Sequence, residues 1–299
     1  MFKTLLTAAL LMTALSSAAN AKIKVVASFS ILGDLVSNVG GELVDVSTIV
    51  GPDSDAHAYE PKPQDVKALA DANLVVVNGL GFEGWQQRLI DASGYSKKVV
   101  TVSEGITALP ADEHHDHDES KSEHFDPHAW QDIRHAMAYV SAIARGLCEV
   151  DASGCQTYKA NALAYTARLD KLSAEIKREF DVIPVDQRII ITSHDAFSYL
   201  GKAFDITFLA PEGISAEADA AAGDVAKLIR QIRNEKAKAL FVESISDPRL
   251  LEQIAQETGL VIGGTLYSDA LSGLEGPAAT YIDMMRHNTR LLVGAILNH

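Results

Sequence analysis

The chain has 299 residues, of which 47% are hydrophobic, and it carries a formal net charge of −14 at pH 7. This length is about twice that of a common domain, so two hydrophobic cores of ordinary size are expected. An acidic chain without a basic stripe argues against nucleic-acid binding, and its acidity is compatible with collecting cations.

The first 21 residues have the pattern of a secretory signal peptide. Lys3 precedes a short apolar run, and residues 19–21 (Ala-Asn-Ala) give the small-residue pattern at which signal peptidase cleaves. The run is too short to span a bilayer, although an N-terminal membrane anchor is the alternative interpretation. The residue directly after the cleavage point is Lys22 and not a cysteine, which argues against a lipid-anchored start. We therefore expect residues 22–299 to be soluble and to lie outside the cytoplasm.

Short runs of β-branched residues alternate with helical patterns along the rest of the chain, which predicts an α/β protein of two domains with parallel sheets. Four strands are expected in each half, at residues 23–29, 43–50, 73–79, 97–102, 187–193, 205–211, 237–244 and 260–267. Helices are expected between them, at residues 30–41, 62–72, 131–147, 217–236 and 247–259. We place the first domain at residues 22–155 and the second at residues 185–299.

One long helix, residues 156–184, is expected to join the two domains and to end at Pro184. Its apolar residues recur at intervals of three and four, or their sums, which predicts one buried stripe made of Leu163, Leu169, Leu172, Ile176 and Phe180. A continuous helix acts as a rigid strut. Ligand binding in the cleft between the domains should therefore tilt them slightly rather than close them widely.

Two cysteines, Cys148 and Cys155, stand seven residues apart just before this helix. In an oxidising compartment an adjacent even pair is most simply a disulfide that closes a small loop. A two-cysteine metal clamp is the alternative, but the usual spacing of two to four residues is lacking. The favoured interpretation is structural.

The segment at residues 111–125 is the one strongly biased stretch of the chain. It alternates acidic residues with four histidines, namely His114, His115, His117 and His124. Such a composition cannot build a core, so we expect a loop that is disordered without a ligand. The sequence leaves open whether this loop attracts metal or is only solvated.

Four other residues combine a metal-binding side chain with the end of a strand or with a loop: His57, His128, His194 and Asp269. Two lie in each half of the chain. Because ligands of open α/β sheets bind beyond the carboxyl ends of the strands, the four residues could converge in the cleft between the domains. Taken singly, each has a plainer interpretation, since a histidine after a strand is often a cap or a surface residue and Asp269 could begin a helix.

The chain resembles the zinc and manganese receptors of bacterial ABC importers over nearly all of its exported length. The resemblance rests on the segment from "VASFSILGDLVSNVGG" to "DSDAHAYEPKP", and on "DPHAW", "SHDAFSYLGKAFDI" and "ALFVESISDPRLLEQIAQETG". In that family the histidines of D-x-H-x-Y-x-P-x-P and D-P-H-x-W are ligands, which implies His57 and His128. A third ligand after the first strand of the second domain and a late aspartate imply His194 and Asp269.

The residue at the position of the third ligand bears on which metal ion is bound. Zinc members of that family generally have histidine there, as His194 is here, while many manganese members have glutamate. Three imidazoles and one carboxylate suit a tetrahedral ion such as Zn²⁺, whereas Mn²⁺ prefers more oxygen ligands. We therefore expect zinc, with manganese as the alternative. Because ligating imidazoles are neutral, affinity should fall below a pH of about 6.5.

The resemblance also implies a monomeric receptor that docks on a permease with its ATPase. Zinc members often carry a histidine-rich insertion at the position of residues 111–125. The loop could therefore raise the local metal concentration or accept zinc from a periplasmic donor protein, and a passive loop is the alternative.

A zinc hydrolase is the main alternative function. It is disfavoured because a fourth protein ligand leaves no open position, and because H-E-x-x-H and G-x-S-x-G are absent from the sequence. Glu217 and Glu243 could be proposed as bases, but roles at the surface or behind the ligands are favoured. Nothing in the sequence suggests an adhesin.

Overall fold

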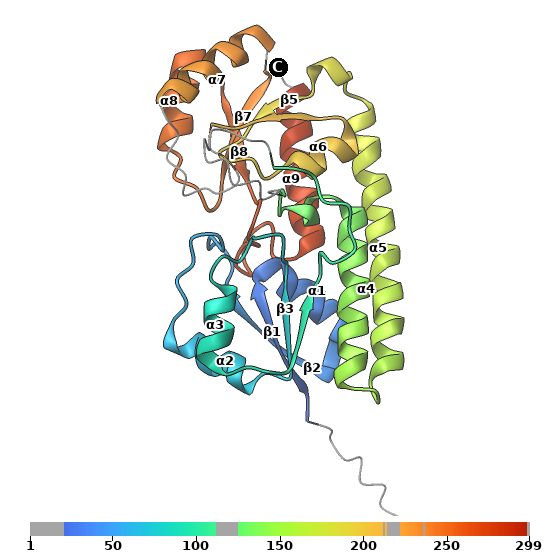
Figure 1. Cartoon of the computed structure of the whole chain (residues 1–299). Coiled ribbons are helices and arrows are strands. Elements are labelled where there is room, and N and C mark those ends of the chain that lie inside the picture. Colours follow the sequence, from blue (N-terminus) through green and yellow to red (C-terminus); the bar gives the residue numbers. More distant parts are fainter. Residues whose placement is uncertain (1–20, 112–124, 212, 214–221, 236, 298–299) are drawn as a thin grey trace, which may run out of the picture.

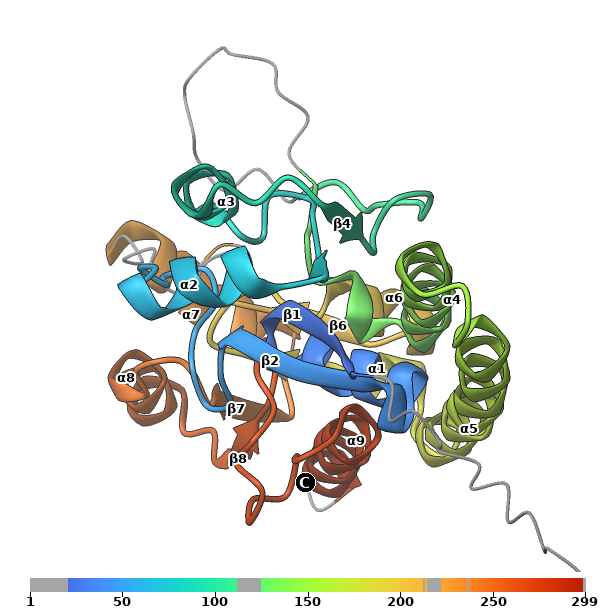
Figure 2. The same cartoon turned by 90° about the horizontal axis from the view of Figure 1, so that it is seen from below.

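The computed structural model describes residues 21–111, 125–211, 213, 222–235 and 237–297 (Figure 1). Two four-stranded parallel sheets form the centres of two α/β domains, and a long helix runs beside both (Figures 1 and 2). The predicted fold class, including the site between the domains, is confirmed. All but one residue of the expected signal peptide lie outside the described residues.

The first domain is built on strands whose side chains are mostly buried on both faces, as expected for a sheet covered by helices. The sheet order is β2-β1-β3-β4, made of β1 (Ile23–Phe29), β2 (Val44–Val50), β3 (Leu74–Val77) and β4 (Lys98–Thr101). Its helices are α1 (Ser30–Gly40), α2 (Pro63–Asp71), α3 (Gln86–Ser93) and α4 (Ile133–Val150). Helix α3 was not predicted from the sequence.

The second domain repeats this strand order as β6-β5-β7-β8. Its strands are shorter than predicted: β5 (Ile189–Ile191), β6 (Thr207–Leu209), β7 (Ala239–Glu243) and β8 (Ile262–Leu266). Its helices are α6 (Ser198–Phe204), α7 (Ala222–Glu235), α8 (Arg249–Thr258) and α9 (Tyr281–Leu297). Because α9 begins only at Tyr281, Asp269 is not the N-cap of a helix and lies in a connecting segment.

The long helix α5 (Cys155–Asp181) packs against α1, α4 and α9, and so contacts both domains. Its buried stripe is Tyr158, Ala162, Tyr165, Leu169, Leu172, Ile176 and Phe180. The expectation for Leu163 was wrong, since this side chain is 74% exposed. The stripe passes through Ala162 instead, and the next residue along an α-helix points about 100° away.

One apolar core is continuous across both domains, because buried residues such as Val76 of the first sheet and Phe241 of the second belong to one cluster. A smaller cluster, which includes Leu240 and Ile254, lies elsewhere in the second domain. The two domains are therefore fused by apolar packing rather than joined by a flexible linker. Within the described ranges, no helix combines the length and the apolarity needed to cross a membrane.

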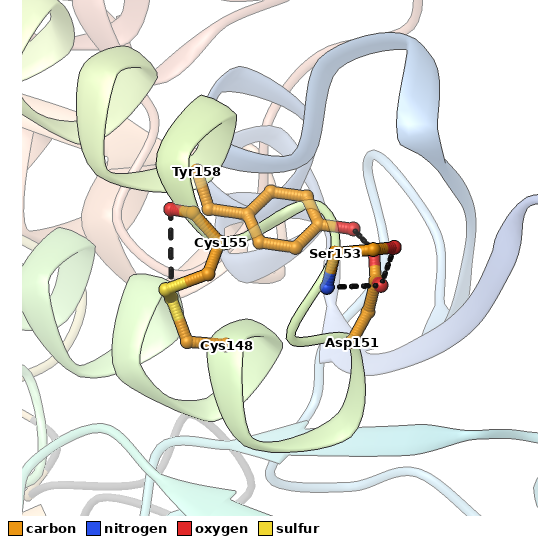
Figure 3. Close-up of a disulfide and its surroundings, with 5 residues drawn as sticks. All are labelled: Cys148, Asp151, Ser153, Cys155 and Tyr158. Carbon is orange, nitrogen blue, oxygen red and sulfur yellow. Dashed lines mark hydrogen bonds between the residues drawn. A yellow bond between two sulfur atoms is a disulfide. The ribbon is translucent and has the colours of Figure 1, made fainter.

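The predicted disulfide is present and joins the end of α4 to the start of α5 (Figure 3). Asp151 lies in the turn between the two helices and accepts hydrogen bonds from the Tyr158 hydroxyl (2.7 Å) and from the backbone N–H of Ser153 (3.1 Å). The turn is thus held by covalent and polar contacts together.

Replacing both cysteines by serine should lower the free energy of unfolding by about 2.5 kcal/mol, because the bond closes a short loop in the unfolded chain. Metal affinity should not change, since the 18 residues of α4 separate this turn by about 27 Å from the helix end that adjoins His128. Urea unfolding and metal titration of both proteins would measure the two effects. A tenfold loss of affinity would contradict this separation.

Candidate metal centre

The carboxyl ends of both sheets point toward the boundary between the domains, and three of the four candidate residues lie in segments that directly follow a strand. His57 lies in the loop between β2 and α2, and His128 directly precedes a 3-10 turn (Ala129–Gln131). His194 follows β5, and Asp269 follows β8. The structure therefore brings together all four residues that the sequence indicated, two from each domain.

Their donor atoms all lie within 4.8 Å of one another. Asp269 Oδ2 is 3.3 Å from His57 Nε2, 3.5 Å from His128 Nε2 and 3.2 Å from His194 Nε2. The Nε2 atoms of His57 and His128 are 3.2 Å apart. Tetrahedral ligands of a zinc ion, with bonds of roughly 2.0–2.1 Å, are about 3.3–3.4 Å apart, so one ion of that size fits among these atoms.

The cluster is shielded from water. His128, His194 and Asp269 have no exposed surface, while the His57 side chain keeps 9%. The second carboxylate oxygen of Asp269, Oδ1, is buried without a hydrogen-bond partner. Leaving such an atom unpaired is costly, and a cation beside the carboxylate would compensate it. This is the donor set of a divalent-metal site.

Two of the three imidazoles are backed by buried carboxylates. His128 Nδ1 is 2.8 Å from Asp126 Oδ1, and His194 Nδ1 is 2.8 Å from Glu243 Oε2. Glu243 also accepts the backbone N–H of His194 (3.0 Å), so the favoured role behind a ligand fits it. Asp126 accepts the Nδ1 proton of His128 and so directs the Nε2 lone pair of that ring toward the shared point. The contact between His194 Nδ1 and Glu243 is an ion pair without hydrogen-bond geometry. Glu217 lies outside the described residues.

The loop of His57 is fixed differently. Its ring packs edge-on against Phe82 at 4.5 Å, and its backbone N–H donates to Asp55 Oδ1 at 2.7 Å. The indole N–H of Trp85 donates to the carbonyl of Ala56 at 2.8 Å. Among the described residues, no carboxylate contacts His57 Nδ1. His57 is thus the most exposed and the least supported of the three histidines.

A buried network aligns the turn that carries His128. The Asn78 side chain donates to the carbonyl of Pro127 (2.9 Å), and the Tyr139 hydroxyl donates to Asn78 Oδ1 (2.8 Å). Sequence reasoning missed Asn78, Trp85 and Asp126. Asp126 had a detectable signal, because it stands two residues before the histidine in the quoted D-P-H motif.

The electrostatics of the metal-free site favour protons on His128 and His194. Burial alone lowers the pKa of His128, but the charges of Asp269 and Asp126 outweigh it and raise this pKa to about 9. Burial likewise opposes the charged form of His194, and Glu243 with Asp269 still holds its pKa well above the usual value. Conversely, burial raises the pKa of Asp269, yet His128 and His194 bring it well below the usual range.

The other predicted metal-binding histidines, His114, His115, His117 and His124, lie outside the described residues. Phe125, just beyond them, forms an antiparallel bridge with Pro110.

Comparison with known proteins identifies relatives of nearly full length. A family model described as "Zinc-uptake complex component A periplasmic" matches residues 25–295. The manganese-binding lipoprotein MntA of Halalkalibacterium halodurans is 37% identical over 275 residues, covering 92% of this chain and 88% of the relative. The iron-binding protein YfeA of Yersinia pestis is 35% identical over 266 residues, covering 88% and 83%.

Similar solved structures include a Mn-bound periplasmic metal-binding protein from Candidatus Liberibacter asiaticus, with a TM-score of 0.82 and 30% identity over 92% of this chain and 100% of that one. The periplasmic zinc-binding protein TroA of Treponema pallidum has a TM-score of 0.83 and 30% identity, over 92% and 99%.

The metal-free protein should lose stability as the pH rises from about 6.5 to 9. A histidine whose pKa is higher in the folded state than its unfolded value of about 6.5 stabilises the fold fully below that value, and this contribution disappears as the pH passes the folded value of about 9. Metal affinity should rise over the same interval, because the ion displaces these protons. The pH below which metal affinity falls should therefore lie above the value of about 6.5 that was expected from the sequence.

Melting temperatures across this pH range, measured with a chelator and with saturating Zn²⁺, would test the effect. The loaded protein should show little change, and His128→Ala should flatten the metal-free profile. A metal-free melting temperature that stays constant from pH 6.5 to 9 would refute the protonated site.

Proposed function

The chain belongs to the family of zinc-uptake complex component A, the periplasmic metal-binding receptors of ABC importers, and we propose from this that His57, His128, His194 and Asp269 hold the one metal ion that it delivers. The observation that carries the proposal is the convergence of these four side chains, two from each domain, on one buried point. Capture there and release to a permease driven by its ATPase follow from the family.

Zinc is the cargo that the donor set favours. Three imidazole nitrogens and one carboxylate match the ligands and the tetrahedral spacing of Zn²⁺. Mn²⁺ usually takes more oxygen ligands, and only Asp269 supplies carboxylate oxygen directly among the four residues. A bidentate Asp269, using the unpaired Oδ1, would still leave three nitrogens.

Manganese is the second candidate, and the names of relatives favour it over zinc. MntA is named for manganese, as is PsaA of Streptococcus anginosus, which is 32% identical over 89% of this chain, while YfeA is named for iron. The Candidatus Liberibacter asiaticus protein has been solved with Mn and with Cd. The zinc proposal rests on the donor chemistry of the site, with the description of the family model and the zinc-binding protein TroA in its support.

The protein is a binding protein and not an enzyme, in keeping with its family. The four-ligand site offers a physical reason, because Asp269 takes the position that water occupies in a catalytic zinc centre. Residues 1–21 are proposed as a cleaved signal, and the exported chain as a monomer. We assign the first domain to residues 22–155, the connecting helix to 156–184 and the second domain to 185–299.

His194→Ala should remove tight binding of one metal per chain in a competitive titration. The loss should exceed the roughly 10–100-fold that removing a partner behind a ligand causes, because a donor atom itself disappears. His287→Ala is the matched control, since this histidine lies on α9, where its Nε2 contacts the Thr265 carbonyl oxygen, outside the cluster. Tight binding that survives His194→Ala would exclude the site.

Affinity does not identify the cargo, because Zn²⁺ binds such ligands more tightly than Mn²⁺ whichever ion is physiological. The metal content of the protein isolated from its own periplasm, after growth limited in zinc or in manganese, decides between them. Zinc in both samples supports the first candidate, and manganese in the zinc-limited sample supports the second.

Residues 111–125 are proposed to raise the local metal concentration or to accept zinc from a donor protein. A segment of this composition loses conformational entropy when it is ordered around an ion, so its own affinity should be lower than that of the cluster. Deleting residues 113–124 should leave equilibrium affinity nearly unchanged and slow the loading rate in stopped-flow measurements. A hundredfold loss of affinity would contradict this role, and an unchanged loading rate would indicate a passive segment.

A further inference from the structure

Asp269 follows the last strand of the second domain, yet the residue before it is held by the first domain. The indole N–H of Trp130 and the side-chain amide of Gln131 both donate to the carbonyl oxygen of Ser268, at 2.9 Å and 2.8 Å. These two donors use both lone pairs of that oxygen. Trp130, Gln131 and Ser268 are all fully buried, so water does not compete for these bonds.

The segment after Asp269 is attached to the first domain as well. The backbone N–H of Leu271 donates to Ser30 Oγ (2.9 Å), and the N–H of Asp53 donates to the Leu271 carbonyl (2.9 Å). The N–H of Gly273 donates to Asp53 Oδ2 (2.9 Å). Asp269 therefore lies between two points at which its segment is anchored to the first domain.

The second domain binds this segment at Tyr267, one residue before Ser268. The Asn288 side chain of α9 accepts the N–H of Tyr267 (3.0 Å) and donates to its carbonyl (2.7 Å). Beyond Tyr267, the hydrogen bonds of Ser268, Leu271 and Gly273 described above lead to the first domain. The Ser268–Asp269 peptide is thus oriented by Trp130 and Gln131, which lie in the 3-10 turn directly after His128.

We propose that Trp130 and Gln131 are positioning residues that hold Asp269 at the metal from across the domain boundary. The inference rests on the proposed ligand role of Asp269. Because Trp130 and Gln131 hold Asp269, the first domain presents three of the four donors, His57, His128 and Asp269, as one preassembled group. His194, backed by Glu243, is then the one donor presented by the second domain alone.

The test uses Trp130→Phe and Gln131→Leu. The first keeps an aromatic ring beside Phe29 and Phe82, whose centroids lie 5.0 Å and 4.8 Å from that of Trp130, and removes the indole donor at the cost of some buried volume. The second keeps a side chain of similar volume without an amide. Asn161→Leu is the matched control, because it removes an amide donor to a backbone carbonyl (Val39, 3.0 Å) away from the site.

Competitive Zn²⁺ titration should give a loss of affinity of roughly 10–100-fold for each of the two variants, as for other outer partners of metal ligands, and no change for Asn161→Leu. The visible spectrum of the Co²⁺-loaded protein reports ligand number and geometry directly. It should change in both variants and stay that of the wild type in the control, even where thermal melting shows equal destabilisation.

Asp269→Ala tests the ligand role of Asp269 separately from the positioning role of Trp130 and Gln131. If this variant binds Zn²⁺ as the wild type does, the proposed ligand set fails. If it loses affinity while Trp130→Phe and Gln131→Leu keep both wild-type affinity and the Co²⁺ spectrum, the ligand set stands and the positioning role is overturned. Should one of the two variants fail to fold, as judged by circular dichroism, the other decides.

Discussion

A buried carboxylate surrounded by three imidazoles is the constraint on which the rest of the structure depends. Asp269 has no exposed surface and lies 3.2–3.5 Å from three histidine nitrogens. A charge in such a place requires a compensating charge, because desolvation is costly. Protons on His128 and His194 supply it in the metal-free protein, and a dication supplies it in the loaded protein. Metal capture is therefore an exchange of positive charges at a site whose negative charge is permanent.

The fold was largely predictable because its signals are local. Runs such as residues 23–29 and 73–79 are β-branched, and the helices between them have glycine or proline at their ends, so the parallel two-domain plan follows from neighbouring residues. Leu163 shows the limit of this method, because a stripe with few apolar residues fits two helical faces equally well. Strands β6 and β8 were predicted too long, since apolar residues such as Ile206, Val261 and Tyr267 continue beyond the strands themselves.

The candidate site was predictable in its four main residues because each stands in a distinctive motif or after a strand. The residues that position these four side chains were not predictable. Trp130 and Gln131 contact Ser268 across 138 and 137 positions, and Asn78 contacts Pro127 across 49. Hydrogen bonds between such distant residues leave no periodic pattern in a sequence. Their geometry depends on how the two domains meet, which only the folded chain determines.

The disulfide between α4 and α5 has a consequence for the biogenesis of a periplasmic protein. In the reducing cytoplasm Cys148 and Cys155 remain thiols, so the turn between the two long helices is held by Asp151 and its partners alone. The newly made chain is then closer in free energy to its unfolded ensemble. Oxidation in the periplasm removes conformations from that ensemble. The disulfide therefore contributes to the stability of the folded chain only after export.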